Sequence, residues 1–133
     1  TIDNKQASIL IVEDNEVNLK VAEKMLNKVA PNMVISSVLS GEAALQVIER
    51  KAFDLIIMDC QMPGMDGFET SQKLRERHFE GVIVACTANT TDGIEARCLG
   101  AGMNDYMPKP LRLEGIRHML TRWLGVASES DSK

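Results

Sequence analysis

Five polar residues of this sequence stand after runs of apolar residues. Glu13 and Asp14 follow "ILIV", Asp59 follows "LIIM", Thr87 follows "VIVAC", and Lys109 comes shortly after "DYM". Three carboxylates that lie close together repel one another, and each resists ionisation unless a cation is present. A set of oxygen ligands with no nearby histidine favours Mg²⁺, while a hydroxyl and a lysine are donors that suit phosphate oxygens. If these residues meet in space, they form a site for a phosphoryl group.

Each of these residues has an ordinary structural explanation when it is taken alone. Asp14 with Asn15 could cap a helix, as could Asp66 before "GFET", which we interpret as a helix cap only. Thr87 could simply end a strand, and Lys109 could be a surface lysine. The joint position of all five residues at the ends of apolar runs favours a functional site over separate coincidences.

The chain alternates short β-type runs with longer amphipathic patterns. The strands that we predict are residues 8–12, 33–38, 54–58, 81–86 and 105–107. The helices that we predict are residues 15–30, 41–51, 66–78, 91–100 and 112–124. Five strand–helix pairs with short links predict an α/β fold, in which a five-stranded parallel sheet carries helices on both faces. In such a sheet, ligands bind outside the carboxyl ends of the strands, where the five polar residues would meet.

Length and composition indicate one globular domain. The chain has 133 residues, of which 44% are hydrophobic and 26% are charged, and a chain of this size buries enough surface to fold without a metal or a disulfide. We predict that the domain spans residues 8–125, between a linker at residues 1–7 and a polar tail at residues 126–133. The net charge of −4 predicts no nucleic-acid partner.

The sequence also bears on the compartment. No apolar run reaches the roughly 18 residues of a membrane span, and no signal peptide opens the chain, so we expect a cytoplasmic protein without direct membrane contact. The chain has an odd number of cysteines, and no two of them have C-x-x-C spacing: they are Cys60, Cys86 and Cys98. We therefore expect three reduced, buried thiols and neither disulfides nor a zinc site.

Four stretches of the sequence, in order, resemble the receiver domains of two-component response regulators. They are "ILIVEDN", "DLIIMDCQMPGMDG", "VIVACTA" and "DYMPKP", and together they extend over nearly all of the chain. The resemblance implies a flavodoxin-like (βα)5 fold with the strand order 2-1-3-4-5. It also implies a cis peptide bond between Lys109 and Pro110.

The resemblance further implies a role for each site residue. Asp59 would be the phosphoacceptor, Thr87 and Lys109 would bind the phosphoryl oxygens, and Tyr106 would be the aromatic switch residue. Mg²⁺ would be held by four groups: Glu13, Asp14, Asp59 and the backbone carbonyl of Gln61. The implied function is that of a phosphorelay receiver, which takes a phosphoryl group from a phosphohistidine and is not a conventional enzyme.

Parts of the sequence are similar to the receivers of hybrid histidine kinases, more than to those of transcription factors. These parts are "EDNEVNLKVAEKML", "CQMPGMDGFE" and "CLGAGMNDYMPKP". The implied partner is a histidine kinase or a histidine phosphotransfer domain. If the chain belongs to a hybrid protein, the parent would be a histidine kinase, and the domain could be the cytoplasmic part of a membrane-bound sensor. A free-standing shuttle protein is the alternative context.

Two other functions remain compatible with the sequence. One is an interaction module that works without phosphorylation, and the other is a small Mg²⁺-dependent aspartyl phosphatase or phosphotransferase. Such an enzyme commonly has a second Asp two positions after its nucleophile, where this chain has Gln61. Nucleotide binding is disfavoured, because neither G-x-x-x-x-G-K-S/T nor G-x-G-x-x-G occurs.

The helix after the first acid pair suggests where a partner docks. We expect four of its residues to face the sheet: Val21, Ala22, Met25 and Val29. This orientation leaves Leu19 half covered at the edge of the apolar arc and places Asn18 inside the arc. We therefore predict a docking rim formed by Asn15 and Leu19 together with Leu111, which follows Pro110. An ordinary surface leucine is the plainer explanation of Leu19.

Overall fold

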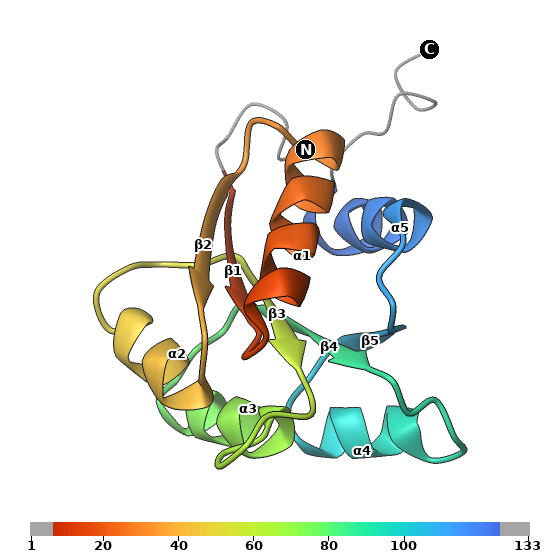
Figure 1. Cartoon of the computed structure of the whole chain (residues 1–133). Coiled ribbons are helices and arrows are strands. Elements are labelled where there is room, and N and C mark those ends of the chain that lie inside the picture. Colours follow the sequence, from red (N-terminus) through yellow and green to blue (C-terminus); the bar gives the residue numbers. More distant parts are fainter. Residues whose placement is uncertain (1–6, 126–133) are drawn as a thin grey trace.

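The computed structural model describes residues 7–125, which form alternating strands and helices (Figure 1). The strands are β1 (Ser8–Val12), β2 (Val34–Val38), β3 (Leu55–Asp59), β4 (Val82–Thr87) and β5 (Asp105–Pro108). The helices are α1 (Glu16–Val29), α2 (Gly41–Val47), α3 (Gly67–Glu76), α4 (Ile94–Gly100) and α5 (Leu113–Leu124). Every strand begins and ends within one residue of its predicted range.

All five strands are parallel and lie in the order β2-β1-β3-β4-β5, which confirms the predicted fold. In this register Val12 pairs with Met58, and Asp59 pairs with Cys86. Because parallel strands end at the same edge of a sheet, the residues that follow β1, β3, β4 and β5 are brought together there.

The helices cover both faces of the sheet and create two hydrophobic cores. Figure 1 shows α1 and α5 on one face, and α2, α3 and α4 on the other. Ile9 and Ile11 of β1 belong to the first core, whereas Leu10 and Val12 belong to the second. The central strands are apolar at every position because their alternating side chains are buried on both faces.

Local sequence signals set the starts of three helices. The side chains of Asn15, Ser40 and Asp66 accept hydrogen bonds from N–H groups in the first turns of α1, α2 and α3, as N-cap residues do. Asp66 is therefore the helix cap that the sequence predicted.

Every helix is shorter than predicted, and the largest differences at a single end are in α2 and α4. α2 ends at Val47 and not at residue 51, and the chain continues from there in hydrogen-bonded turns. α4 begins at Ile94 and not at residue 91. The physical reason in α4 is Gly93, whose φ of 91° lies outside the range of a right-handed helix.

The folded unit begins one residue earlier than predicted. Ala7, which we assigned to the linker, is buried, and its carbonyl accepts a hydrogen bond from the Val34 N–H at 2.9 Å. The remainder of the predicted linker and the predicted tail at residues 126–133 lie outside the described residues. Within residues 7–125, no helix is long and apolar enough to cross a membrane. The cysteines are buried free thiols, as expected.

α3 and α4 end in the same type of turn, with different residues at its centre. After α3, the Phe79 N–H donates to the Leu74 carbonyl and the His78 N–H donates to the Arg75 carbonyl, which is the pattern of a Schellman motif. His78 adopts a left-handed conformation with a φ of 70°, whereas the turn after α4 has Gly102 there with a φ of 90°. Only the turn after α3 therefore carries the steric strain of a Cβ atom at this position.

Replacing His78 with glycine should stabilise the protein. His78 is exposed, so the change removes no buried contact while it relieves the left-handed strain. We expect the free energy of unfolding, measured by urea denaturation, to rise by about 0.5–1 kcal/mol. The matched control is His118→Gly, because His118 is exposed within α5 and glycine should lower the stability there by roughly 0.5 kcal/mol. A His78→Gly protein that is no more stable than the wild type would contradict this account.

Candidate functional site

Asp59 is the last residue of β3, the central strand of the sheet. All residues of β3 are buried, and Asp59 itself is only 2% exposed. β1 and β4 flank β3, so the Asp59 carboxylate lies in the middle of the edge where the strands end. A carboxylate in this position is held by a rigid element and is reached from the loops that follow the strands.

The loop after β3 folds closely over Asp59. The Gln61 N–H donates a hydrogen bond to Asp59 Oδ1 at 3.2 Å, and the Gly67 N–H donates to the Cys60 carbonyl at 3.1 Å. Gly67, the first residue of α3, lies so close to this backbone that a Cβ atom there would overlap the Asp59 carbonyl. Only glycine therefore allows the start of α3 to approach the site this closely.

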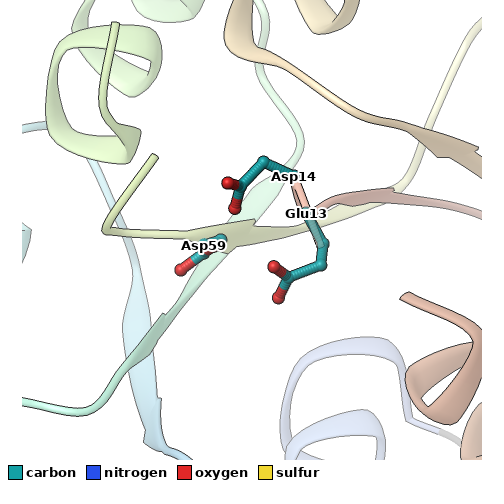
Figure 2. Close-up of side chains that lie close together, drawn as sticks. All are labelled: Glu13, Asp14 and Asp59. Carbon is teal, nitrogen blue, oxygen red and sulfur yellow. The ribbon is translucent and has the colours of Figure 1, made fainter. Parts of the chain in front are cut away.

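Glu13 and Asp14, which follow β1, bring two more carboxylates to Asp59. One oxygen from each of the three acids lies within 4.8 Å of the others, and Figure 2 shows the three side chains converging from the ends of β1 and β3. Glu13 is buried, whereas Asp14 is exposed. Burial raises the pKa of Glu13 and the charge of Asp59 adds to this effect, although the Asn15 N–H, which donates to Glu13 Oε2 at 3.1 Å, opposes it.

Lys109 brings a positive charge to these acids from the end of β5. Its Nζ lies 2.8 Å from Asp59 Oδ1 and 3.5 Å from Glu13 Oε1. Burial alone would lower the pKa of Lys109, but the hydrogen bond to Asp59 and the charges of both acids outweigh burial and raise the pKa above its usual value. The Lys109 N–H donates to the Thr87 carbonyl at 2.9 Å, and the Lys109–Pro110 bond is cis, as the resemblance implied. The lysine is therefore charged and held on the site by its own backbone.

The chemistry of the converging groups fits a Mg²⁺ ion. The ligands on offer are carboxylate oxygens, and Mg²⁺ is typically bound through one or two carboxylates while it keeps several waters. Within residues 7–125, the Asp14 carboxylate has no hydrogen bond or ion pair, so it is free to bind a metal, whereas Glu13 already contacts Lys109 and Asn15. The Gln61 backbone lies at the site through its bond to Asp59, and its carbonyl as a further ligand stays a prediction.

Thr87 lies at the end of β4, as predicted, but its hydroxyl is engaged in a local turn. The hydroxyl donates to the Asn89 carbonyl at 3.1 Å and accepts a hydrogen bond from the Asn89 N–H at 3.0 Å. Tyr106, in β5, is half-buried and packs against the core under α2, α3 and α4. The structure therefore gathers the three predicted acids within 4.8 Å of one another and brings Lys109 into contact with Asp59 and Glu13, and it holds Thr87 beside them in a separate hydrogen-bonded loop.

The structure corrects the predicted orientation of α1. Leu19 is 9% exposed and belongs to the core with Ala22 and Leu26, whereas Asn18 is exposed. Val21, which we expected to face the sheet, is 44% exposed. The expected half-exposure of Leu19 and burial of Asn18 are therefore wrong. The helix is rotated relative to the prediction because Leu19 and Leu26 are buried against the sheet in place of Val21.

This rotation exposes two valines that the predicted docking rim did not include. Val17 is 71% exposed, and Val21 lies one turn further along α1. Val21 also lines a cleft of about 380 Å³, together with Pro110, Leu111 and Asp59. The i, i+4 spacing of the two valines was visible in the sequence, but α1 has apolar residues on more than one side, so periodicity alone did not decide which side is buried.

The sequence matches known proteins along nearly its whole length. A family model described as "Response regulator receiver domain" matches residues 9–121. The chain is 38% identical over 125 residues to hybrid signal transduction histidine kinase B of Dictyostelium discoideum and 34% identical over 132 residues to sensor histidine kinase GacS of Pseudomonas protegens. These matches cover 84% and 96% of this chain, but only 6% and 14% of the two relatives. The chain therefore corresponds to a small part of each relative.

Two solved structures share the fold over most of the chain. The receiver domain of sensor histidine kinase PA1611 from Pseudomonas aeruginosa, with a magnesium ion coordinated in its active site cleft, has a TM-score of 0.78 and 38% identity, covering 91% of this chain and 99% of that one. A Saccharomyces cerevisiae complex of the histidine phosphotransfer signaling protein Ypd1 with the receiver domain of Ssk1 gives a TM-score of 0.82 and 26% identity, with 96% of both chains covered. The arrangement of strands and helices is therefore shared with proteins of known structure.

Asp14→Asn should weaken Mg²⁺ binding more than Glu13→Gln does. Asp14 is the exposed carboxylate without a protein partner, whereas the oxygens of Glu13 are already engaged. We expect isothermal titration calorimetry with Mg²⁺ to give an affinity lower by about tenfold or more for Asp14→Asn, and a smaller loss for Glu13→Gln. Circular dichroism of both variants controls for the fold. Equal losses in the two variants would contradict the unequal roles.

Proposed function

The chain belongs to the family of response regulator receiver domains, and on this basis we propose that Asp59 is the residue on which it accepts a phosphoryl group. Membership of this family makes the chain a phosphorelay phosphoacceptor with an acidic Mg²⁺ site. The observation that carries the assignment is the position of Asp59. Among residues 7–125, it is the buried carboxylate that ends the central strand and accepts hydrogen bonds from both Lys109 and the Gln61 N–H.

Asp59 acts in this proposal as a carboxylate nucleophile toward a phosphohistidine of the donor. A bond forms between an Asp59 oxygen and phosphorus, while the bond between phosphorus and the imidazole nitrogen breaks and the imidazole keeps the electron pair. Lys109 offsets negative charge on the transferring oxygens. Mg²⁺, held by Glu13, Asp14, Asp59 and the Gln61 carbonyl, would supply further positive charge to the same oxygens when bound.

Thr87 and Tyr106 form the proposed switch. The phosphoryl group adds about −1.5 to −2 charge close to a buried hydroxyl that can donate to it. To do so, Thr87 has to give up the hydrogen bond that its hydroxyl donates to the Asn89 carbonyl, and this change moves the start of the loop between β4 and α4. Tyr106, which is half-buried in the neighbouring strand, then turns into the space that Thr87 leaves.

We propose that the phosphohistidine donor, a histidine kinase or a histidine phosphotransfer domain, docks on the cleft between α1 and the chain after β5. Val17 and Val21 offer exposed apolar surface on α1, Asn15 is exposed at its start, and Leu111 lines the same cleft. Asp59 also lines this cleft, so a helix seated there can present a histidine to it. The complex of Ypd1 with the Ssk1 receiver supports the class of partner. The sequence predicted Leu19 as part of the docking surface. Because Leu19 is buried, the exposed residues Val17 and Val21 take its place in this proposal.

We further propose that the domain is the receiver part of a hybrid histidine kinase and works in the cytoplasm. The chain spans only 4 to 14% of the length of the first curated relatives, several of which are hybrid histidine kinases. The buried free thiols suit a reducing compartment. The kinase activity of the parent protein would reside outside this domain.

Phosphorylation of Asp59 predicts a specific change in mass. Incubation with acetyl phosphate and Mg²⁺ should add one phosphoryl group to the wild type, and Asp59→Asn should abolish this gain because the amide is a poor nucleophile. Intact-mass spectrometry measures both. Asp66→Asn is the matched control, since it removes another carboxylate from the same loop and leaves a residue that still caps α3. Full labelling of Asp59→Asn would refute the assignment, and an unlabelled wild type would favour an interaction module that works without phosphorylation.

The proposed docking surface predicts a defect with one class of donor only. Val21→Asp should slow phosphoryl transfer from a phosphorylated histidine phosphotransfer domain by about tenfold or more, because a charge replaces an apolar contact near the centre of the interface. Labelling by acetyl phosphate should stay unchanged. Leu99→Asp is the matched control, since Leu99 is also an exposed apolar residue but lies on α4. Equal slowing with both donors would place the defect in the site or the fold and would rule out this docking surface.

A further inference from the structure

A second cleft opens beside Asp59, on the side of α4. Its volume is about 400 Å³, and its walls come from the loop after β3, the start of α3, the loop after β4, and α4. Gln61, which donates to Asp59, and Thr87, at the end of the neighbouring strand, both line it. The cleft therefore adjoins the proposed phosphoacceptor site through Gln61 and Thr87, and it is separate from the cleft between α1 and the chain after β5.

Arg97 of α4 is the cation that lines this cleft. Its guanidinium carbon lies 4.0 Å from the ring centroid of Phe68, which is on α3. Among the described residues 7–125, no carboxylate or carbonyl is paired with this guanidinium, so its N–H donors remain free. Stacking on an aromatic face orients a guanidinium and leaves its edge free to bind a planar anion.

The other polar groups of the cleft also suit an anion. Asn89 and Gln61 carry amides, and Thr87 carries a hydroxyl. Asp66 is the one carboxylate that lines this cleft within the described part of the chain, and its Oδ1 is already occupied by the Glu69 N–H at 2.9 Å, as the cap of α3. The cleft therefore offers one free guanidinium and the amides of Asn89 and Gln61, while the Thr87 hydroxyl is held by Asn89 and one oxygen of the single acid caps a helix.

The geometry of phosphoryl transfer says which part of a donor would lie here. The attacking and leaving groups lie on opposite sides of phosphorus, roughly in line. With Asp59 at the buried end of β3, the leaving group of any donor projects outward from the ends of the strands, where the loops that follow β3 and β4 can contact a small one. These two loops form walls of the cleft that Arg97 lines.

We infer that this cleft is the leaving-group subsite for small acyl phosphate donors, and that Arg97 makes it selective for a leaving group that departs as a carboxylate. This inference rests on the proposed role of Asp59. In the reaction, an Asp59 oxygen bonds to phosphorus, the bond between phosphorus and the bridging oxygen of the acyl phosphate breaks, and the carboxylate leaves with the electron pair. No proton is required.

Arg97 would favour the transition state over the bound donor. Negative charge on the bridging oxygen grows as its bond to phosphorus breaks, so an interaction with a guanidinium strengthens along the reaction. Phosphoramidate provides the contrast, because its nitrogen leaves as neutral ammonia and carries no charge for Arg97 to stabilise. The selectivity of the cleft should therefore appear as a difference between these two donors.

The test compares acetyl phosphate with phosphoramidate on the full chain in the presence of Mg²⁺. Arg97→Gln should lower the apparent second-order rate constant for acetyl phosphate by about fivefold, as expected for an exposed charged contact, and leave that for phosphoramidate unchanged. Arg97→Lys keeps the charge but not the planar fork, so it should show an intermediate loss. Arg50→Gln is the matched control, because it makes the same change in net charge at an exposed residue after α2.

Beryllofluoride, which mimics the phosphoryl group and has no leaving group, gives a second readout. Its affinity, measured by fluorescence titration, should be the same for Arg97→Gln and the wild type. A lower affinity, or equal slowing with both small donors, would mean that Arg97 acts on the phosphoryl group or the fold, and would overturn the inference. Unchanged rates with both donors would also overturn it, while leaving the role of Asp59 intact. An unlabelled wild type would remove the proposed function and this inference with it.

Discussion

The pairing of Lys109 with Asp59 is the interaction on which the site depends. Three carboxylates at one edge of a sheet repel one another, yet a metal ligand and a nucleophile must both stay ionised. Lys109 Nζ lies 2.8 Å from Asp59 and 3.5 Å from Glu13, so it reduces this repulsion with a charge that belongs to the protein. The parallel sheet brings Lys109 to Asp59 and Glu13, because β1, β3 and β5 all end at the same edge of the sheet.

The backbone links this charge to Thr87, which belongs to the proposed switch. Lys109 follows the edge strand β5, and its N–H donates to the carbonyl of Thr87 at the end of β4. Thr87 uses its hydroxyl to hold the start of the next loop through Asn89. A change in the hydrogen bonding of Thr87 therefore acts on a residue whose backbone also positions the lysine, which joins the charge of the site to the loop before α4.

Asp59 lies between two clefts of different chemistry. The cleft beside α1 is lined by apolar side chains such as Val21 and Leu111, whereas the cleft beside α4 is lined by Arg97 and polar residues such as Asn89. An apolar wall suits a protein helix, and a guanidinium suits a small anion. The two proposals therefore assign the contacts of different donors to different walls around Asp59, so that a substitution on one wall can affect one donor without the other.

The sequence by itself determined the strands, the parallel sheet and the polar residues that meet at its edge, because apolar runs that end in acids, a hydroxyl and a lysine are local patterns. Tertiary structure alone decided which side of α1 is buried. The helix has apolar residues on several sides, and packing against the sheet and α5 selected the side of Leu19 and Leu26 and left Val21 outside. The placement of Arg97 over Phe68 was likewise decided by the packing of α4 beside α3, since the two residues are far apart in the sequence and no local pattern relates them.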